Sequence, residues 1–545
     1  MSATSPSNGS TRAAGIREAV VIGGGPNGLV AAAFLAKAGL KPLVVERAER
    51  VGGAAITADV IPGFRCPTLA HRAAIDEVIA RQLELDRHGL AIIKSAARAC
   101  ALAEAGRALT LWSDEVEAAR EIAVFSPRDA EQYPRFLASV AAISGVLRAL
   151  IAAPPPAERA TVADALHLLK TGRRFRALGK TDAYRLLRWL PMAVADFTRE
   201  WFDSEPLCAA VAMDGLQGAF VGPRSAGSTA TLLVLAAGAG HPIAPGWMAR
   251  GGTGAVSDAL AKTAVHAGAE IRTGAEVTQV LVHDGVATGV VLAGGEEIAA
   301  RRVVSSADPR RTFLGLVDPE HLTPEFRRHV QNIRMRGTLA KVNYAVSSVP
   351  GFTGLRALDD RRRAAALSGC VRLCSDTDVA ERAFDAAKYG GYGDELVIEL
   401  TIPSIADPTL APVGRHVVSA YVQYAPYSLR GTTWDAERER FGDMATRTIA
   451  KYAPGFERSV LGRSVVTPLD LERSGGLTGG HIFHGELALD QLFAARPLLG
   501  WARYRTPIKN LYLCGSGTHP GTGLDGRSGA LAASVIVADV RRRPR

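Results

Sequence analysis

The chain is poor in aromatic residues and in cysteine. Phe, Trp and Tyr make up 6% of its 545 residues, and only two of the six cysteines, Cys370 and Cys374, stand close together. Three residues separate them and they lie mid-chain, so we expect two buried thiols and not a redox disulfide. No cysteine and histidine set has the spacing of a zinc site, and we expect no metal. This cysteine usage fits a reducing compartment with free thiols.

Long unbroken hydrophobic runs are also missing. The longest apolar windows, near residues 19–38 and 226–248, are interrupted by glycine, proline or polar residues, so we expect no transmembrane helix. Residues 1–17 lack the apolar core of a signal peptide. They are rich in Ser, Thr and Asn, with Arg12 and Arg17, which fits either a short transit peptide or a solvated tail; we favour a disordered tail.

Glycine, in contrast, is abundant, and one cluster of it is informative. Gly23, Gly25 and Gly28 lie between an apolar run at residues 19–22, which is typical of a buried strand, and an Ala/Leu-rich segment at residues 29–38 with helical spacing. The first glycine permits a tight turn, the second lets the backbone approach a pyrophosphate, and the third allows close helix–strand packing. The pattern predicts an adenine dinucleotide at the helix N-terminus.

An acidic residue follows at the expected place. Residues 43–45 are typical of a second strand, and Glu46 at its end lies eighteen positions beyond Gly28. There it can accept hydrogen bonds from ribose hydroxyls, and it disfavours a 2′-phosphate. A plain strand–helix–strand turn is the alternative. The order strand, turn, helix, strand, acid within about thirty residues favours the dinucleotide.

The residues after Glu46 favour a flavin cofactor over a nicotinamide. Arg47 begins a segment that ends in the pair Gly52 and Gly53, and this pattern resembles the FAD-binding half of the glutathione-reductase-like flavoproteins. Residues 506–515 are similar to the late flavin-contacting strand of that group. Many relatives carry an aspartate after its glycine to hold the ribityl chain. This chain has Ser516 after Gly515, so that hydrogen bond is not expected in the same form.

The C-terminal segment narrows the resemblance. Residues 516–523, followed by Gly526 and Gly529, resemble the C-terminal signature of the phytoene desaturase-like family, and the resemblance spans nearly the whole chain. Residues 479–486 and 513–516 are similar to one branch, the pyridine nucleotide-disulfide oxidoreductase domain-containing protein 2 group. Members of this group are oxidoreductases with no firmly assigned substrate.

This resemblance implies an α/β fold with a discontinuous Rossmann-type, glutathione-reductase-like FAD-binding domain and an inserted α+β substrate domain. The FAD-binding domain would comprise residues 18–75, 245–310 and 466–540. The substrate domain would comprise residues 76–244, mostly helical, and 311–465, richer in alternating strands. The residues expected to bind FAD are Gly23, Gly25, Pro26, Asn27, Gly28, Glu46, Arg47, Gly52, Gly53, Ala54, Val277, Gly515, Ser516, Gly523 and Leu524.

The sequence carries a single complete dinucleotide fingerprint, so we expect no second nicotinamide site. The resemblance then implies an oxidoreductase in which a hydride passes from a hydrophobic, isoprenoid or lipid-like substrate to flavin N5, with electrons leaving to oxygen, a quinone or another acceptor. One alternative is an amine or amino-acid oxidase of the same fold. Another is a non-catalytic binding or regulatory protein, which the intact FAD glycines disfavour.

Candidate catalytic residues are few. His519 lies among glycines at the expected flavin-facing turn, where it could take up a proton or serve a structural role. His481 and His484, close to Glu486, could be misread as metal ligands; their turn suits a wall of the substrate cavity better. Glu472 and His71 are weaker candidates and are typical of ion-paired or structural residues.

The chain is basic, with a net charge of +10 and a pI of about 9.4. Residues 170–190 concentrate this charge between apolar residues, which fits a helix pair lying on an anionic membrane or a solvated helix face. Nucleic acid is not expected, because no nucleic-acid fold is recognised. The expected location is cytoplasmic, including peripheral membrane contact, or the mitochondrial matrix in a eukaryote. A homo-oligomer is left open.

Overall fold

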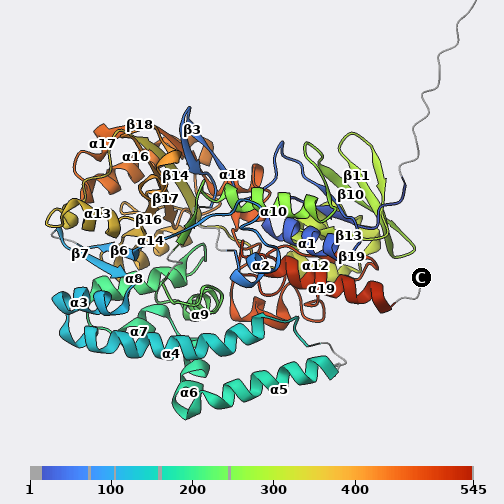
Figure 1. The fold of residues 1–545 in the computed structure, drawn as a ribbon, viewed down its shortest axis with the longest axis horizontal. Coiled ribbons are helices and arrows are strands. Elements are labelled where there is room, and N and C mark those ends of the chain that lie inside the picture. Colours follow the sequence, from blue (N-terminus) through green and yellow to red (C-terminus); the bar gives the residue numbers. More distant parts are fainter. Residues whose placement is uncertain (1–14, 71–74, 104–105, 157–161, 244–246, 543–545) are drawn as a thin grey trace, which may run out of the picture.

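The computed structural model describes residues 15–542 except 71–74, 104–105, 157–161 and 244–246. Two large sheets organise the chain, and each lies in its own half of the molecule (Figure 1). One is a parallel sheet covered by helices, and the other is a mainly antiparallel sheet with a helical layer beside it. The fold is therefore α/β, a Rossmann-like domain with a substrate domain, as expected.

The parallel sheet gathers strands that are far apart in the sequence. Its order is β19 (Leu511–Leu513), β13 (Val303–Ser305), β1 (Val20–Ile22), β2 (Leu43–Val45) and β9 (Glu270–Arg272). All neighbouring pairs are parallel. Each of the three segments assigned to the FAD-binding domain thus contributes at least one strand to this sheet.

Side chains of the parallel sheet alternate between two cores. Val21, Val44 and Val304 face the helices α1 (Pro26–Lys37), α10 (Gly254–His266) and α19 (Arg527–Arg542). Val20 and Val303 face a second layer made of β10 (Val277–His283), β11 (Val286–Leu292) and β12 (Glu297–Ala299). Because successive strand residues point to opposite faces, both faces of this sheet need apolar residues, which explains the unbroken valine and isoleucine runs.

The larger sheet combines both inserted segments. Its order is β18 (Val460–Val466), β14 (Leu339–Val346), β17 (His416–Gln423), β16 (Val397–Thr401), β15 (Cys370–Leu373), β6 (Ala97–Leu102) and β7 (Ala108–Trp112). The strands predicted at residues 396–402 and 416–424 are confirmed to within one residue at each end. The first insertion, expected to be mostly helical, also supplies β6 and β7, and β6 pairs in parallel with β15.

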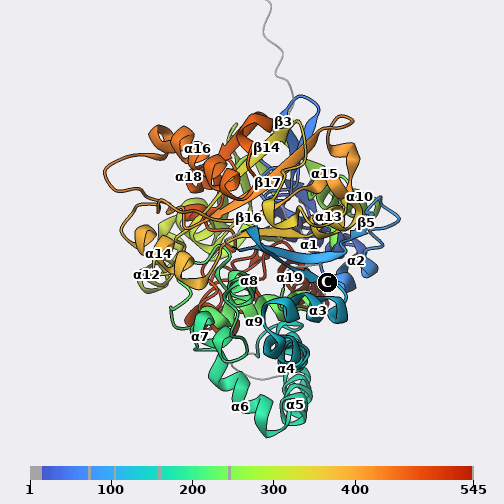
Figure 2. The same cartoon turned by 90° about the vertical axis from the view of Figure 1, so that its left-hand side faces the viewer.

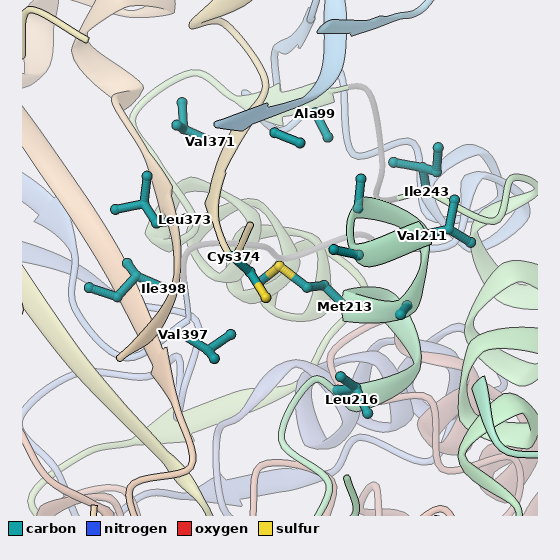
Figure 3. Close-up of a cluster of buried hydrophobic side chains, with 14 of the residues drawn as sticks. Ala99, Val211, Met213, Leu216, Ile243, Val371, Leu373, Cys374, Val397 and Ile398 are labelled. Carbon is teal, nitrogen blue, oxygen red and sulfur yellow. The ribbon is translucent and has the colours of Figure 1, made fainter. Parts of the chain in front are cut away.

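A helical layer packs beside this sheet (Figure 2). It consists of α3 (Glu115–Phe125), α4 (Pro127–Ile151), α5 (Val162–Ala177), α6 (Gly179–Trp189), α7 (Val194–Arg199), α8 (Glu205–Leu216) and α9 (Ser228–Ala239). Helix α8 is buried along most of its length, and Met213 on it meets Cys374 in the core between helix and sheet (Figure 3). This contact joins the two inserted segments into one hydrophobic core.

Within the described residues, α4 is the one helix that is long and apolar enough to cross a membrane by length and composition. Its Tyr133, Phe136 and Val140 side chains are buried, and it packs against α3 and α9. These contacts are typical of a core helix.

The remaining elements connect the two domains or cover their edges. They are α2 (Glu77–Gln82), β3 (Thr57–Ile61), β4 (Phe64–Pro67), β5 (Ile92–Lys94), β8 (Trp247–Ala249), α11 (Pro309–Arg311), α12 (Pro324–Gln331), α13 (Asp360–Ala366), α14 (Thr377–Lys388), α15 (Pro403–Ala406), α16 (Trp434–Tyr452), α17 (Phe456–Ser459) and α18 (Pro468–Arg473).

Two expectations about the chain's periphery and thiols can be compared with the structure. Arg17, assigned to the disordered tail, donates its backbone N–H to Ala299 and its guanidinium to Glu270; residues 1–14 lie outside the described residues. All six cysteines are free and buried, as expected for Cys370 and Cys374. Burial raises the pKa of the Cys374 thiol to about 12, which suits a structural residue and not a thiolate nucleophile.

Candidate cofactor and substrate site

A cavity of about 450 Å³ opens where the first strand–helix turn of the parallel sheet meets the C-terminal segment. Its volume lies within the range of roughly 300–1,000 Å³ that ligand sites occupy. The residues predicted to bind FAD that line it are Gly23, Gly25, Pro26, Asn27, Gly28, Glu46, Arg47, Gly53, Ala54, Val277, Ser516 and Leu524. We call this space the cofactor cavity.

The glycines of the first turn differ in what requires them. A Cβ on Gly28 would lie 2.2 Å from the carbonyl oxygen of Gly23, so the fold itself demands glycine there. A Cβ on Gly25 would meet only Gly53 Cα, at 3.9 Å, and the φ of Gly25 is −72°, which any residue adopts. The protein's own packing leaves Gly25 free to change. A ligand in the cofactor cavity is the remaining reason for a glycine at this position.

Glu46 reaches the cofactor cavity through a fixed carboxylate. The side chain is buried, and its two oxygens accept the backbone N–H groups of Gly24, at 2.7 Å, and Ala48, at 2.9 Å. A carboxylate offers about four acceptor positions, so these two bonds hold it in place without using its full capacity. The arrangement fits recognition of a ribose diol by the remaining lone pairs.

The N-terminus of α1 faces the same cavity. Pro26 occupies its first turn, and no side chain caps it. The Asn27 side chain instead donates to the Gly523 carbonyl at 2.9 Å, which ties the helix start to the C-terminal segment. Uncapped N–H groups and the helix dipole together form a site for an anion such as a pyrophosphate. These residues therefore fit a dinucleotide.

Three predicted FAD residues do not line the cofactor cavity. A Cβ on Gly52 would lie 2.7 Å from Ile56, and one on Gly515 would lie 2.3 Å from the Ser306 carbonyl oxygen. Both glycines thus allow close packing behind the cavity wall. Gly523 lines a neighbouring cavity, and its N–H donates to Ser516 Oγ at 3.1 Å.

This neighbouring space, which we call the apolar cavity, has a volume of about 160 Å³. It shares the wall residues Ala54, Leu69, Leu477, Ile482 and Leu524 with the cofactor cavity. Its far wall comes from α9 and the segments beside it, and includes Leu235, Ala236, Ala239, Pro242, Phe483 and Tyr421. An apolar molecule held there would lie directly beside one end of a bound dinucleotide.

Lys341 stands between the two cavities, and the sequence analysis missed it. It lies on β14, where its strand partners are Val466, which lines the cofactor cavity, and Tyr421, which lines the apolar cavity. The side chain is 1% exposed, its Nζ donates to the Pro67 carbonyl at 2.5 Å, and it lies 5.2 Å from the Tyr421 ring centroid. Burial lowers its pKa to about 7. A lysine inside an otherwise apolar strand was the signal that could have found it.

The structure brings one of the three candidate histidines to a cavity. His484 lines the cofactor cavity. His481 lines neither cavity, and its Nδ1 accepts the N–H of Phe483 at 3.2 Å, which shapes the local turn. Burial lowers the pKa of His481 to about 3, so it is neutral at ordinary pH.

His519, the first choice from the sequence, also lines neither cavity. Its backbone carbonyl accepts the hydroxyl groups of Tyr504, at 2.8 Å, and Ser528, at 3.1 Å, which fixes the turn. Its ring packs edge-on against Phe493, with centroids 5.5 Å apart, and burial lowers its pKa to about 3. The turn has the predicted glycines, but its tertiary packing directs the imidazole into the core.

Arg496 is a second residue that the sequence analysis missed. It is 2% exposed, and its guanidinium donates to the carbonyl groups of Phe483, at 2.6 Å, Gly485, at 3.2 Å, and Ser516, at 2.9 Å. These bonds join the segment around His484 to the segment around Ser516. Arg496 therefore holds together two parts of the chain that line the cofactor cavity.

The weaker candidates have structural partners or lie outside the described residues. Glu472 accepts the Tyr427 hydroxyl and the Gly479 N–H, the latter at 2.9 Å. His71 lies outside the described residues. Among those residues, no group of three or more His, Cys, Asp or Glu side chains is arranged to hold a metal ion.

Comparison with known proteins places this site in a family. Residues 21–76 match the NAD(P)-binding Rossmann-like domain, and residues 212–537 match the flavin containing amine oxidoreductase family. The chain is 38% identical to pyridine nucleotide-disulfide oxidoreductase domain-containing protein 2 of Rattus norvegicus, over 96% of this chain and 94% of the relative.

More distant relatives have named substrates. One of the two chains of a limonene dehydrogenase from Castellaniella defragrans is 25% identical, over 96% of this chain and 95% of the relative. A lycopene-forming phytoene desaturase of Pseudescherichia vulneris is 27% identical, over 96% and 100%.

A solved structure of a putrescine oxidase variant superimposes with a TM-score of 0.59 at 18% identity, over 97% of this chain and 99% of the other. This similarity shows a shared fold. The chain belongs to the flavin-containing amine oxidase and phytoene desaturase superfamily of FAD-dependent oxidoreductases, within the pyridine nucleotide-disulfide oxidoreductase domain-containing protein 2 group.

Proposed function

We propose that the protein is an FAD-dependent dehydrogenase or desaturase that removes a hydride from a hydrophobic, isoprenoid or lipid-like molecule. The observation that carries this proposal is the apolar cavity, which adjoins the cofactor cavity through five shared wall residues. FAD, when bound, supplies the hydride acceptor, and oxygen, a quinone or another acceptor reoxidises it.

The residues of the cofactor cavity have distinct tasks in holding FAD. Gly25 and the N-terminus of α1 would accommodate the pyrophosphate, and Glu46 would bind the ribose hydroxyls. Val277, at the start of β10, lines the part of the cavity suited to the adenine edge. Ser516 and Leu524 line the cavity beside the C-terminal segment, where the flavin ring is expected.

The apolar cavity suits a hydrocarbon substrate. Its leucine, alanine, proline and phenylalanine side chains offer dispersion contacts and exclude water from the reacting bond. Limonene and phytoene, the compounds in the names of two relatives, are both hydrocarbons. Lys341, with a pKa near neutrality at the junction of the two cavities, is the side chain best placed to give up or take up a proton there.

Spectroscopy of the purified protein tests this function. Visible flavin bands, release of FAD on acid treatment, and bleaching of those bands on anaerobic addition of an isoprenoid or fatty substrate would support the proposal. Bleaching by primary amines or amino acids alone would instead establish an oxidase of the same fold. A protein that binds no FAD after reconstitution would have a binding or regulatory role.

The cofactor assignment has its own test. Replacing Gly25→Val places a branched side chain where the pyrophosphate is expected, so the variant should fold but retain almost no FAD. Gly145→Val is a matched control, because a Cβ at Gly145 on α4 would have no neighbour within 4 Å. If the Gly25 variant kept its full FAD content, the cofactor cavity would have been assigned wrongly.

A further inference from the structure

Helices α5 and α6 lie at the end of the molecule, outside α4, in both views (Figures 1 and 2). They join the body along one side only. On α5, Asp164 and Thr171 are buried, one helical repeat of seven residues apart, and on α6 Leu186 and Trp189 are buried. The opposite sides of both helices face solvent, although they carry large apolar side chains.

The outward side of each helix has an apolar row at helical spacing. On α5, Val162, Leu166 and Leu169 follow one another at i, i+4 and i+7, and they are 79%, 54% and 54% exposed. On α6, Tyr184 and Leu187 are 63% and 61% exposed. Scattered apolar side chains are common on protein surfaces, but aligned rows on two adjacent helices indicate a surface that is covered in use.

Basic residues continue these rows. Five lysine and arginine side chains are exposed on the two helices: Lys170, Arg173, Arg174, Arg176 and Lys180. In the part of the chain that the structure describes, none of the five has a carboxylate partner. The acidic residues of the helices are already engaged, since Asp164 pairs with Arg503 and Asp182 with Arg185. These five side chains therefore present uncompensated positive charge.

We propose that this outer helix surface, formed by the exposed apolar and basic side chains of α5 and α6, binds an anionic lipid bilayer. The apolar rows would enter the boundary between headgroups and acyl chains, and the basic side chains would contact acidic headgroups. A second copy of the chain is a poorer occupant, because a two-fold contact would bring the same five positive charges face to face. A hydrophilic polyanion would leave the apolar rows exposed.

The surface has a structural connection to the apolar cavity, although the proposal does not depend on the proposed reaction. Helix α5 packs on α4, and α4 packs on α9, whose Leu235 and Ala236 line the apolar cavity. Arg148 of α4 also donates to the Ala237 carbonyl on α9 at 2.9 Å. Docking through α5 and α6 would thus hold the substrate domain, and not the parallel sheet, against the bilayer.

Vesicle flotation with the full-length, FAD-loaded protein tests the proposal. The vesicles are equimolar phosphatidylglycerol and phosphatidylcholine, or phosphatidylcholine alone. We expect binding to the anionic vesicles and much weaker binding to the neutral ones. The charge variant Arg173→Gln/Arg174→Gln/Arg176→Gln should lose at least about tenfold in affinity, since each basic side chain near an anionic surface contributes about fivefold.

The apolar rows have a separate variant and both sets have matched controls. Leu166→Ser/Leu169→Ser should also weaken binding about tenfold or more, because each leucine that enters the bilayer contributes to it. The apolar control is Val116→Ser/Val124→Ser on α3, where both valines are exposed. The charge control, Arg328→Gln/Arg361→Gln/Arg447→Gln, removes the same net charge from exposed positions elsewhere. Both controls should bind like the wild type.

Several results would overturn the proposal. Absence of binding to anionic vesicles would do so, as would equal losses in the helix variants and in their controls. Loss in the charge variant with full binding by the leucine variant would indicate contact with a polyanion and not with a bilayer. If gel filtration showed a dimer that the leucine variant converted to a monomer, the surface would be an interface between copies. Unchanged flavin spectra and melting temperatures establish that the variants fold.

Discussion

Replacing Lys341→Met should stabilise the protein, and the gain should depend on pH. The buried environment lowers the pKa of this lysine from its ordinary 10.5 to about 7. That fall corresponds to roughly 5 kcal/mol of differential stabilisation between the protonation states. The unfolded chain holds a proton on Lys341 up to about pH 10, whereas the folded protein begins to lose it near pH 7. The wild type therefore carries a folding cost that methionine, of similar length and without charge, removes.

The sign and size of the effect follow from linkage. The cost is fully present below the folded pKa of about 7, and it disappears as the pH rises through the unfolded value of 10.5. The variant also loses the bond from Nζ to the Pro67 carbonyl, and a buried carbonyl without a donor costs roughly 1–3 kcal/mol. The net gain near pH 7 should be roughly 1–3 kcal/mol, and it should shrink by about 2 kcal/mol between pH 7 and pH 9.

Urea unfolding of the FAD-loaded wild type and variant, followed by circular dichroism between pH 6.5 and 9.5, measures this difference. Lys451→Met is the control, because Lys451 lies exposed on α16 and its replacement should shift stability little at any pH. A Lys341 variant that is less stable than the wild type near pH 7, or a difference that does not shrink as the pH rises, would refute the buried-lysine reasoning.

Two further replacements separate packing from ligand binding. Gly28→Ala should destabilise the fold by at least about 2 kcal/mol even without FAD, because its Cβ would overlap the Gly23 carbonyl, whereas Gly25→Ala should leave the FAD-free protein as stable as the wild type; melting temperatures with and without FAD decide this. Arg496→Met should cost roughly 3 kcal/mol or more and release FAD, since several buried carbonyl groups lose their donor. Retention of wild-type stability and FAD content by the Arg496 variant would show that the two segments are held by other contacts.

The sequence by itself determined the cofactor cradle. Gly23, Gly25, Gly28 and Glu46 fall within one strand–turn–helix–strand unit, so their geometry follows from local backbone rules and from spacing. The apolar runs also predicted the central strands, because a parallel sheet that is buried on both faces needs valine and isoleucine at every position. Where the chemistry is local, reading the sequence was sufficient.

Tertiary structure decided the rest. Lys341, Pro67 and Tyr421 meet only because β14 and β17 pair beside β4, and no local pattern encodes a contact across such separations. The same applies to His519, whose turn was predicted but whose ring is directed into the core by Phe493 and by the bonds that fix its backbone. Spacing along the chain determines which backbone shapes are accessible, whereas packing between distant segments determines where a side chain points and whether it is buried.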